Sequence, residues 1–292
     1  MTNLAHAMTA SAQVDDHLST SDFQRIATLI GDQVGIRLPP AKRLMVEGRL
    51  RKRIRILNLA SLHAYGDYLF RQDGLEAELP FLINAVTTNK TDFFREAEHF
   101  EQMQKLLVPE LLSRRAKERN PLLKVWSAAS STGAEAYTIA MVLADMAAQR
   151  HDFRFSVLGT DISTDVLEQG RRAVYSAEMV TPVPQTMQSR YLMFARRPGI
   201  RPEVRIVPEL RRLVQFQRLN LMSKNYAIDR DVDMIFLRNV LIYFEKSDQA
   251  AVISRLIEHL RPGGYLLLGH SESMIGTSIA MRQVAPAVFQ KA

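Results

Sequence analysis

Residues 123–161 form the part of the sequence that most constrains the fold, because they alternate apolar strands with a small-residue loop and a helix. A first strand is predicted at Leu123–Ala128, a loop at Ala129–Gly133, a helix from about Glu135, and a second strand that ends at Gly159-Thr-Asp161. A loop at the carboxyl end of such a strand can admit a flat cofactor, and a carboxylate beyond the next strand can accept both hydroxyls of a ribose. The pattern therefore predicts an adenosine-binding α/β unit with Asp161 at the ribose.

The loop chemistry narrows the class of adenosine cofactor. A dinucleotide site needs G-x-G-x-x-G and a P-loop needs G-x-x-x-x-G-K-[ST], whereas this loop has only Gly133. Glu135 would repel phosphates from the helix start, where they usually bind. An acidic loop favours a ligand with positive charge near the ribose, such as the sulfonium and ammonium groups of S-adenosylmethionine. The alternative is that Glu135 only stabilises the helix N-terminus.

Composition excludes several other classes. The chain has 292 residues, of which 47% are hydrophobic and 24% charged, as in an ordinary globular protein. It has no cysteine, which excludes disulfides, thiolate catalysis and cysteine-based metal sites. Neither a signal peptide nor a membrane-spanning segment is visible, so we expect a cytoplasmic protein that is not inserted in a membrane.

The positive charge of the chain is concentrated between residues 41 and 57. This segment has seven basic residues against the single acid Glu47. On a helix, Lys42, Arg49 and Arg53 would lie nearly in line beside an apolar stripe. A solvated face is one interpretation, and docking on an acidic protein surface or a nucleic acid is the other.

The pattern of hydrophobic residues divides the chain into a flexible tail (1–20), an all-helical domain (21–88) that begins at Ser21 as a helix cap, and an α/β domain (89–292). Short alternating runs at about 176–213, around Arg196–Pro202, predict an inserted antiparallel β-subdomain. The parallel strands are predicted at Val125–Ala128, Phe155–Gly159, Val214–Leu219, Met234–Leu237 and Tyr265–Gly269, followed by a terminal hairpin at Ala280–Gln283 and Ala287–Gln290.

Several motifs together resemble one known family. They are Thr88–Glu96, Trp126–Gly133, Gly159–Asp161, Phe236–Phe244 and Leu260–Glu272, in that order along residues 21–290. This set resembles the chemotaxis receptor glutamate O-methyltransferases, the CheR family. One departure is that Ala134-Glu-Ala136 stands where the family commonly has Glu-Glu-Pro, so the acidic contact is assigned to Glu135.

The resemblance implies a Rossmann-like S-adenosylmethionine-dependent methyltransferase domain with a small antiparallel β-insert, preceded by an all-helical domain. It implies methylation of receptor glutamates without a metal, with S-adenosylhomocysteine as coproduct. Lys42, Arg49 and Arg53 would dock on the cytoplasmic helices of chemoreceptors, with no nucleic acid expected. It leaves open whether the β-insert grips a tethering peptide at a receptor's C-terminus. Arg95 and Tyr243 would be catalytic, and the cofactor contacts would be Asn89, Thr91, Arg95, Glu135, Asp161, Asn220, Leu221, Arg238 and Asn239.

Some of these positions have plainer interpretations. Arg95 and Glu96 could form an exposed helix pair, Tyr243 could belong to the core, and Asn239 could cap the next helix. His270 is interpreted as structural because the sequence offers it no neighbouring metal ligands, and Arg261–Gly264 as a helix stop and turn. Two other functions are a nucleic-acid methyltransferase, although no N-P-P-Y or D-P-P-Y motif is present, and a non-catalytic adaptor that binds receptors or a signalling nucleotide.

Overall fold

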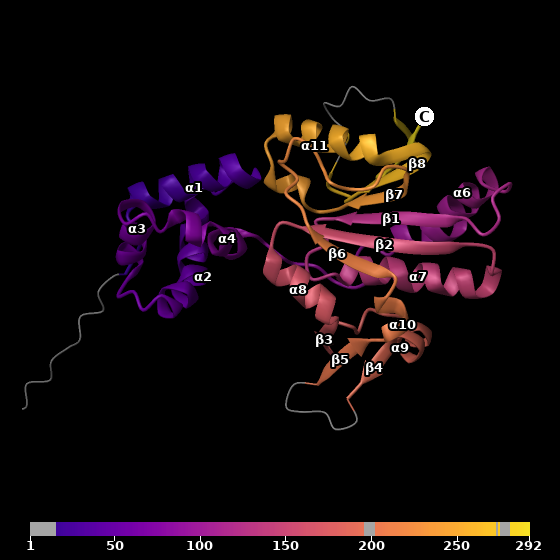
Figure 1. Ribbon diagram of the computed structural model, residues 1–292, viewed down its shortest axis with the longest axis horizontal. Coiled ribbons are helices and arrows are strands. Elements are labelled where there is room, and N and C mark those ends of the chain that lie inside the picture. Colours follow the sequence, from indigo (N-terminus) through magenta and orange to yellow (C-terminus); the bar gives the residue numbers. More distant parts are fainter. Residues whose placement is uncertain (1–15, 196–201, 273, 275–280) are drawn as a thin grey trace, which may run out of the picture. The chain divides into compact units, whose positions relative to one another are not determined.

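The computed structural model describes residues 16–195, 202–272, 274 and 281–292. These residues form two compact units (Figure 1). One unit contains Leu38–Val86 and the described residues up to Leu29, and the other contains Ile30–Arg37 and Thr87–Ala292. None of the described helices is long and apolar enough to cross a membrane.

The first unit is helical, as the sequence predicted. Ser19, not Ser21, begins the first helix, because the Ser19 Oγ accepts a hydrogen bond from the Asp22 backbone N–H at 2.9 Å. Ile26, Leu50 and Leu82 are fully buried and form part of its core. The helices are α1 (Thr20–Val34), whose last turn belongs to the second unit, a 3₁₀ turn at Pro40–Lys42, α2 (Arg43–Ile56), α3 (Leu62–Arg71) and α4 (Leu75–Val86).

The predicted flexible tail is wrong for residues 16–20. Asp16 Oδ1 accepts a hydrogen bond from the Leu62 backbone N–H at 2.7 Å, and Asp16 Oδ2 pairs with Arg51 at 3.0 Å. Leu18 is only 1% exposed. This segment is therefore fastened to the helical unit; residues 1–15 lie outside the described part of the chain.

The second unit is built on a seven-stranded sheet in the order β6-β2-β1-β7-β8-β10-β9. The five strands from β6 to β8 are parallel, β10 runs antiparallel to β8, and β9 runs antiparallel to β10. The strands are β1 (Leu122–Ala128), β2 (Arg154–Asp161), β6 (Val214–Arg218), β7 (Val232–Leu237), β8 (Leu260–Leu268), β9 (Met281–Ala285) and β10 (Val288–Lys291). This sheet confirms the predicted fold class.

Helices cover both faces of the sheet, so the central strands β1, β7 and β8 are buried over most of their length. α7 (Ala134–Arg150) and α11 (Lys246–His259) lie on opposite faces (Figure 1). Val125 and Phe236 pack in the core on the α7 side, whereas Trp126 and Ile235 pack in the core on the α11 side. The remaining helices of this unit are α5 (Glu98–Gln102), a π-helical turn (Met103–Leu107), α6 (Val108–Arg114), α8 (Thr164–Arg172), α9 (Gln185–Tyr191), α10 (Pro208–Arg211) and a 3₁₀ turn at Leu241–Tyr243.

The predicted β-insert is present as a three-stranded antiparallel sheet in the order β3-β5-β4. Its strands are β3 (Val174–Ser176), β4 (Leu192–Phe194) and β5 (Glu203–Ile206). The insert therefore begins at Val174, earlier than residue 176, because Val174 pairs with Arg205. The segment 196–201 of the predicted loop lies outside the described residues.

Arg261–Gly264 does not form the predicted turn before the fifth strand. These residues lie inside β8, where the register against β7 shifts between Val232 and Met234. Gly263 has a φ of +75°, a value that suits glycine, and Gly264 packs against the Asp233 carbonyl. The four residues are thus an irregular strand start, and the helix α11 ends before them at His259.

Candidate active site

The carboxyl ends of β1, β2, β7 and β8 lie at one edge of the sheet. Because β1 has β2 on one side and β7 on the other, the chain reverses its direction of progress across the sheet at β1. Ligands of open parallel sheets bind at such a reversal, outside the carboxyl ends of the strands. The loops that follow these four strands carry the polar groups described below.

Asp161, at the tip of β2, is a buried carboxylate that is 8% exposed. Its Oδ2 accepts a hydrogen bond from the Ser131 N–H and its Oδ1 from the Ser163 N–H, both at 2.9 Å. Burial raises the pKa of Asp161 although these backbone donors oppose the change. A carboxylate has about four lone-pair sites, so each oxygen can still accept from a ribose hydroxyl.

The loop after β1 owes its shape to a close approach between glycines and an aromatic ring. A Cβ at Gly133, Gly159 or Gly170 would lie 2.7, 2.8 or 2.9 Å from the Phe216 ring. Gly133 also has a φ of +87°, in the left-handed region. The Phe216 ring thus fixes the distance between the loop, β2 and α8.

Glu135, in the first turn of α7, binds Arg238, which also binds Glu96. Arg238 donates to Glu135 Oε2 at 3.0 Å and to Glu96 Oε2 at 3.0 Å, and Ser127 donates to Glu135 Oε1 at 2.7 Å. Arg238 is only 7% exposed. Burial alone would raise the pKa of Glu96, but the positive charge and hydrogen bond of Arg238 stabilise the carboxylate more, so the pKa is lowered. Glu135 therefore does more than stabilise the helix N-terminus.

Glu96 is a site residue that the sequence did not reveal. It does not form an exposed helix pair with Arg95: it lies in a turn with a φ of 54°, before α5 begins, and its partners are Arg238 and Asn239. The Arg95 side chain instead donates to the Lys90 carbonyl at 3.3 Å, while its own carbonyl accepts from Arg238. No pattern in the sequence pointed to this Glu96–Arg238 pair, whose members are 142 residues apart.

Asn239, after β7, is held by a second unanticipated carboxylate, Glu272. Glu272 Oε2 accepts from the Asn239 and Gly269 N–H groups at 2.9 and 2.7 Å, and its Oε1 accepts from those of Val240 and Leu241 at 2.8 Å each. Burial raises the pKa of Glu272, although the four backbone donors oppose it. Asn239 has a φ of 58°, so Glu272 stabilises a strained turn rather than a simple helix cap.

The segment 89–95 meets the loop after β1. The Ser131 Oγ donates to the Asn89 carbonyl at 2.9 Å, which places Asn89 beside the residue that binds Asp161. Thr91 and Arg95 are both half-buried. Non-glycine residues with left-handed backbone gather here: Phe94, Glu96, Ala129, Ser131 and Asn239, with φ from 51° to 58°.

Three other predicted residues follow β6 and β7. The Asn220 side chain donates to the Gln33 carbonyl at 2.7 Å and accepts from the Met222 N–H at 2.9 Å. Leu221 is 7% exposed and packs in the core on the α11 side. Tyr243 is half-buried rather than part of that core, and its carbonyl accepts from the Arg37 N–H at 3.1 Å.

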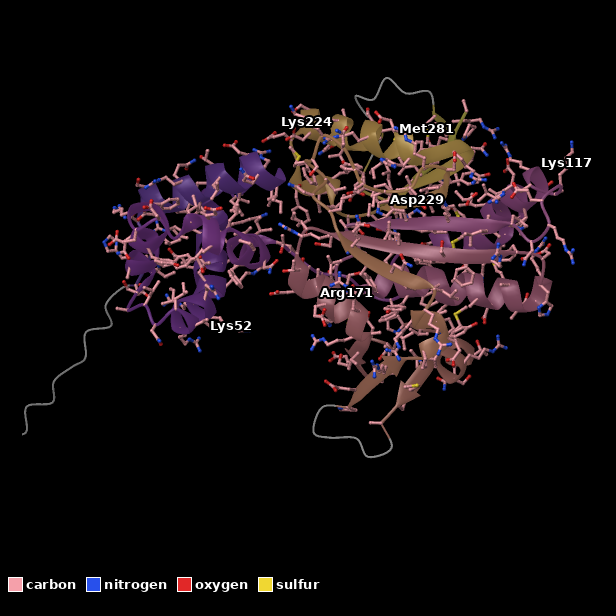
Figure 2. The ribbon with its side chains drawn as sticks, in the orientation of Figure 1. Lys52, Lys117, Arg171, Lys224, Asp229 and Met281 are labelled. Atoms are coloured by element: carbon pink, nitrogen blue, oxygen red, sulfur yellow. The ribbon has the colours of Figure 1, made fainter. Side chains whose placement is uncertain are left out.

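The basic segment forms α2, but its arginines differ in their partners. Arg53 makes two hydrogen bonds, at 2.8 and 2.6 Å, with Glu78, which is 1% exposed, and its guanidinium lies 3.6 Å from the Phe81 ring centroid. Arg49 is exposed and donates to the Ala85 carbonyl at 3.1 Å. Lys42 is half-buried and Lys52 is exposed on α2 (Figure 2). Arg53 therefore stabilises the helical unit and is committed to Glu78.

These features define the class of the protein. A mostly parallel sheet of this order, an acidic helix start after β1 and a buried carboxylate at the tip of β2 are those of an S-adenosylmethionine-dependent methyltransferase. A model of the CheR methyltransferase SAM-binding domain matches residues 89–288, and one of the CheR methyltransferase all-alpha domain matches residues 21–87. The chain belongs to the CheR methyltransferase family.

Named relatives cover nearly the whole chain. It is 36% identical to chemotaxis protein methyltransferase 2 of Pseudomonas aeruginosa, over 94% of this chain and 95% of that protein. It is 41% identical to the chemotaxis protein methyltransferase of Salmonella typhimurium, over 88% of this chain and 85% of that protein. It is 40% identical to the chemotaxis protein methyltransferase of Escherichia coli, over 89% of this chain and 88% of that protein.

Proposed function

We propose that the protein transfers a methyl group from S-adenosylmethionine to glutamate side chains of chemoreceptors and forms methyl esters. The relatives are named chemotaxis protein methyltransferases, which supports a receptor as substrate. The observation that carries the cofactor assignment is Asp161, a buried carboxylate whose two oxygens are oriented by the Ser131 and Ser163 N–H groups. The acidic Glu135 suits the ammonium group of the same cofactor better than a phosphate.

The chemistry asks little of the protein beyond positioning. When bound, S-adenosylmethionine supplies an electrophilic methyl group next to a positive charge. The substrate glutamate has an ordinary pKa of about 4.3, so it is already an anion at pH 7 and needs no general base. Alignment of two reactants and exclusion of water can contribute several kcal/mol to the barrier. The proposed mechanism therefore needs no nucleophile–base pair.

The roles of individual residues follow from their places. Asp161 would bind the ribose. Glu135 would bind the methionine ammonium group while it also remains bonded to Arg238. Arg95 would orient either the substrate carboxylate or that of methionine, and Tyr243 would line the methyl path. The remaining proposed cofactor contacts are Asn89, Thr91, Asn220, Leu221, Arg238 and Asn239.

The cofactor assignment is tested with Asp161→Ala. We expect the variant to lose S-adenosylmethionine binding in calorimetry, because the ribose hydroxyls lose their acceptor. Asp165→Ala is the matched control, since Asp165 is exposed in the first turn of α8. Unchanged affinity of Asp161→Ala would reject the site.

The substrate assignment is tested by incubation with a labelled methyl donor and receptor membranes. We expect base-labile label on the receptor with the wild-type protein and none with Asp161→Ala. Label that resists base, or label on nucleic acid, would contradict the proposal of a glutamate ester.

We propose that a basic surface formed by the half-buried Lys42, in the 3₁₀ turn before α2, and by the exposed Arg49 of α2 docks on acidic receptor helices. Because Arg53 binds the buried Glu78, a charge reversal there would disturb the helical unit itself. The sharper test is Arg49→Glu with Lys52→Glu, which should raise the KM for receptor and leave cofactor affinity unchanged. Lys224→Glu, at an exposed position elsewhere (Figure 2), is the control. Equal KM values would exclude this docking face.

We also propose that the β-insert is where a C-terminal receptor peptide would bind. The support is that β4 is an edge strand of the described three-stranded sheet, and that its Met193 and Phe194 are 42% and 55% exposed. Peptides add to such edges through backbone hydrogen bonds. A peptide of a receptor's last residues should bind the wild-type protein more tightly than Phe194→Ser, and equal affinities would reject the site.

A further inference from the structure

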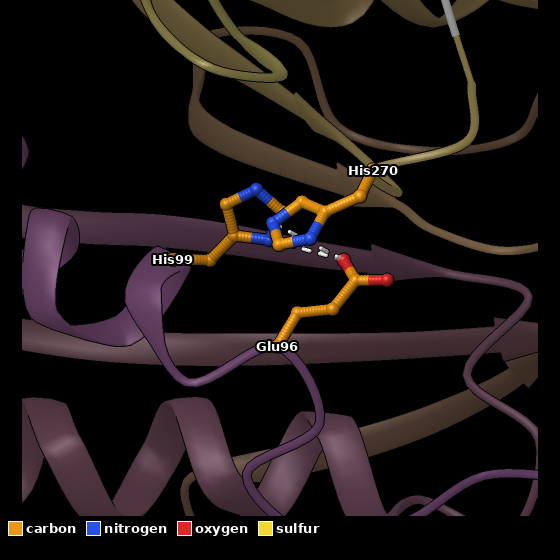
Figure 3. Close-up of side chains that lie close together, drawn as sticks. All are labelled: Glu96, His99 and His270. Atoms are coloured by element: carbon orange, nitrogen blue, oxygen red, sulfur yellow. Dashed lines mark ion pairs between the residues drawn. The ribbon is translucent and has the colours of Figure 1, made fainter.

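Three potential metal ligands, Glu96, His99 and His270, lie close together (Figure 3), and Glu96 is also bound by Arg238. Glu96 and His99 come from the turn before α5 and from α5 itself, and His270 comes from the loop after β8. Their ligand atoms all lie within 4.8 Å of one another. His270 thus has the neighbours that the sequence did not show.

The distances suit a tetrahedral transition-metal ion. Zinc binds nitrogen and oxygen ligands at about 2.0–2.2 Å, so two ligands of a tetrahedral site lie about 3.4 Å apart. His99 Nδ1 lies 3.5 Å from Glu96 Oε2, and His270 Nε2 lies 4.0 Å from the same oxygen. A small rotation of the His270 side chain, which is 48% exposed, would close the remaining gap.

His99 supplies an independent indication of a ligand. It is 0% exposed, and neither ring nitrogen has a hydrogen-bond partner among the described residues. A buried polar group without a partner destabilises the folded state. A neutral imidazole has one ring nitrogen with a lone pair that can bind a metal ion.

The local charge also admits a cation. Arg238 is hydrogen-bonded to both Glu96 and Glu135, so these three groups together carry one net negative charge. Arg238 opposes a metal ion at Glu96, and its second carboxylate partner reduces that opposition. The arrangement of two imidazoles and one carboxylate is a ligand set that zinc uses in proteins.

We propose that Glu96, His99 and His270 form a binding site for a divalent transition-metal ion, with Zn²⁺ as the best-suited ion. The ion would share Glu96 with Arg238 and so place positive charge next to the proposed cofactor site. Because S-adenosylmethionine carries a sulfonium, the two ligands should weaken each other's binding by the same factor. This coupling rests on the proposed cofactor site, whereas the metal site itself does not.

The experiment uses the full chain after removal of metals by a chelator. Zn²⁺ binding is measured by competition with a chromophoric chelator, and Co²⁺ is added separately to record its visible absorption. We expect one Zn²⁺ per chain and the intense bands of four-coordinate Co²⁺. In His270→Ala the affinity should fall by at least about tenfold, since loss of a group that only hydrogen-bonds to a metal ligand already costs about 10–100-fold.

His63→Ala is the control, because His63 is an exposed histidine in α3 and pairs with Asp67. Equal Zn²⁺ affinity of wild-type protein and His270→Ala, or wild-type binding that does not saturate below millimolar Zn²⁺, would overturn the site. Cofactor affinity measured with and without Zn²⁺ tests the coupling, and equal values would overturn it. Cofactor binding that is absent even without metal would instead contradict the proposed function.

Discussion

Replacement of Glu272 by glutamine should loosen the loop that carries Asn239 and Tyr243. The carboxylate accepts four backbone hydrogen bonds, two on each oxygen, at 2.7–2.9 Å. In Glu272→Gln one oxygen remains, and the new NH₂ group faces two N–H donors. Each lost hydrogen bond to a charged group is worth about 1.5–3 kcal/mol, so we expect a loss of about 3–6 kcal/mol if the loop stays in place. The loop should rearrange so that the loss of stability is smaller, and this rearrangement should displace Asn239.

The assay combines urea unfolding with cofactor titration. Glu272→Gln should lower the free energy of unfolding by about 2 kcal/mol or more and weaken cofactor binding. Glu272→Asp keeps the charge and should recover part of both losses. Glu258→Gln, at an exposed position on α11, is the control. Stability and cofactor affinity of Glu272→Gln equal to those of the control would refute the role of this carboxylate.

Three further predictions concern packing, charge and pH. Gly159→Ala should lower the free energy of unfolding by about 1–3 kcal/mol, because its Cβ would lie 2.8 Å from the Phe216 ring; wild-type stability in urea would contradict this contact. Arg53→Ala should destabilise the helical unit by about 3 kcal/mol, because Glu78 stays buried without its partner, whereas the exposed Arg55→Ala should have little effect on its thermal unfolding. His99 has a lower pKa in the folded than in the unfolded state, so the stability of the protein should fall as pH decreases from about 6.5 towards about 4, by at most about 1.4 kcal/mol per pH unit. His99→Leu, measured with a chelator present, should lack this part of the slope, and an identical pH profile would exclude a neutral buried His99.

The central parallel strands β1, β7 and β8 could be predicted because they are buried on both faces and so form largely apolar runs. The strand–loop–helix–strand pattern of residues 123–161 also predicted that Asp161 ends a strand and that Glu135 lies at the start of a helix, as the structure has them. β3 was missed because three residues, Val174–Ser176, are too short to show a period. The prediction of a turn at Arg261–Gly264 was wrong because proline and glycine are typical of turns, whereas here they lie in a strand whose register shifts.

The charged network of the site could not be predicted, since its partners are distant in the sequence. Glu272 binds backbone N–H groups about 30 residues away, and backbone donors leave no trace in a side-chain pattern. Arg53 looked like a free cation on a basic helix, because Glu78 lies 25 residues further along the chain. In both cases a carboxylate becomes buried only after the chain has folded around it.

The five left-handed residues around the site carry an evolutionary consequence. Each such conformation costs a non-glycine residue about 1–3 kcal/mol, and glycine would relieve most of that strain. A search for more heat-resistant variants would therefore tend to favour glycine at Ala129 or Asn239. Such variants should hold the reactants less rigidly. Selection for catalytic activity should therefore keep the strained residues, although their replacement offers the easiest gain in thermal stability.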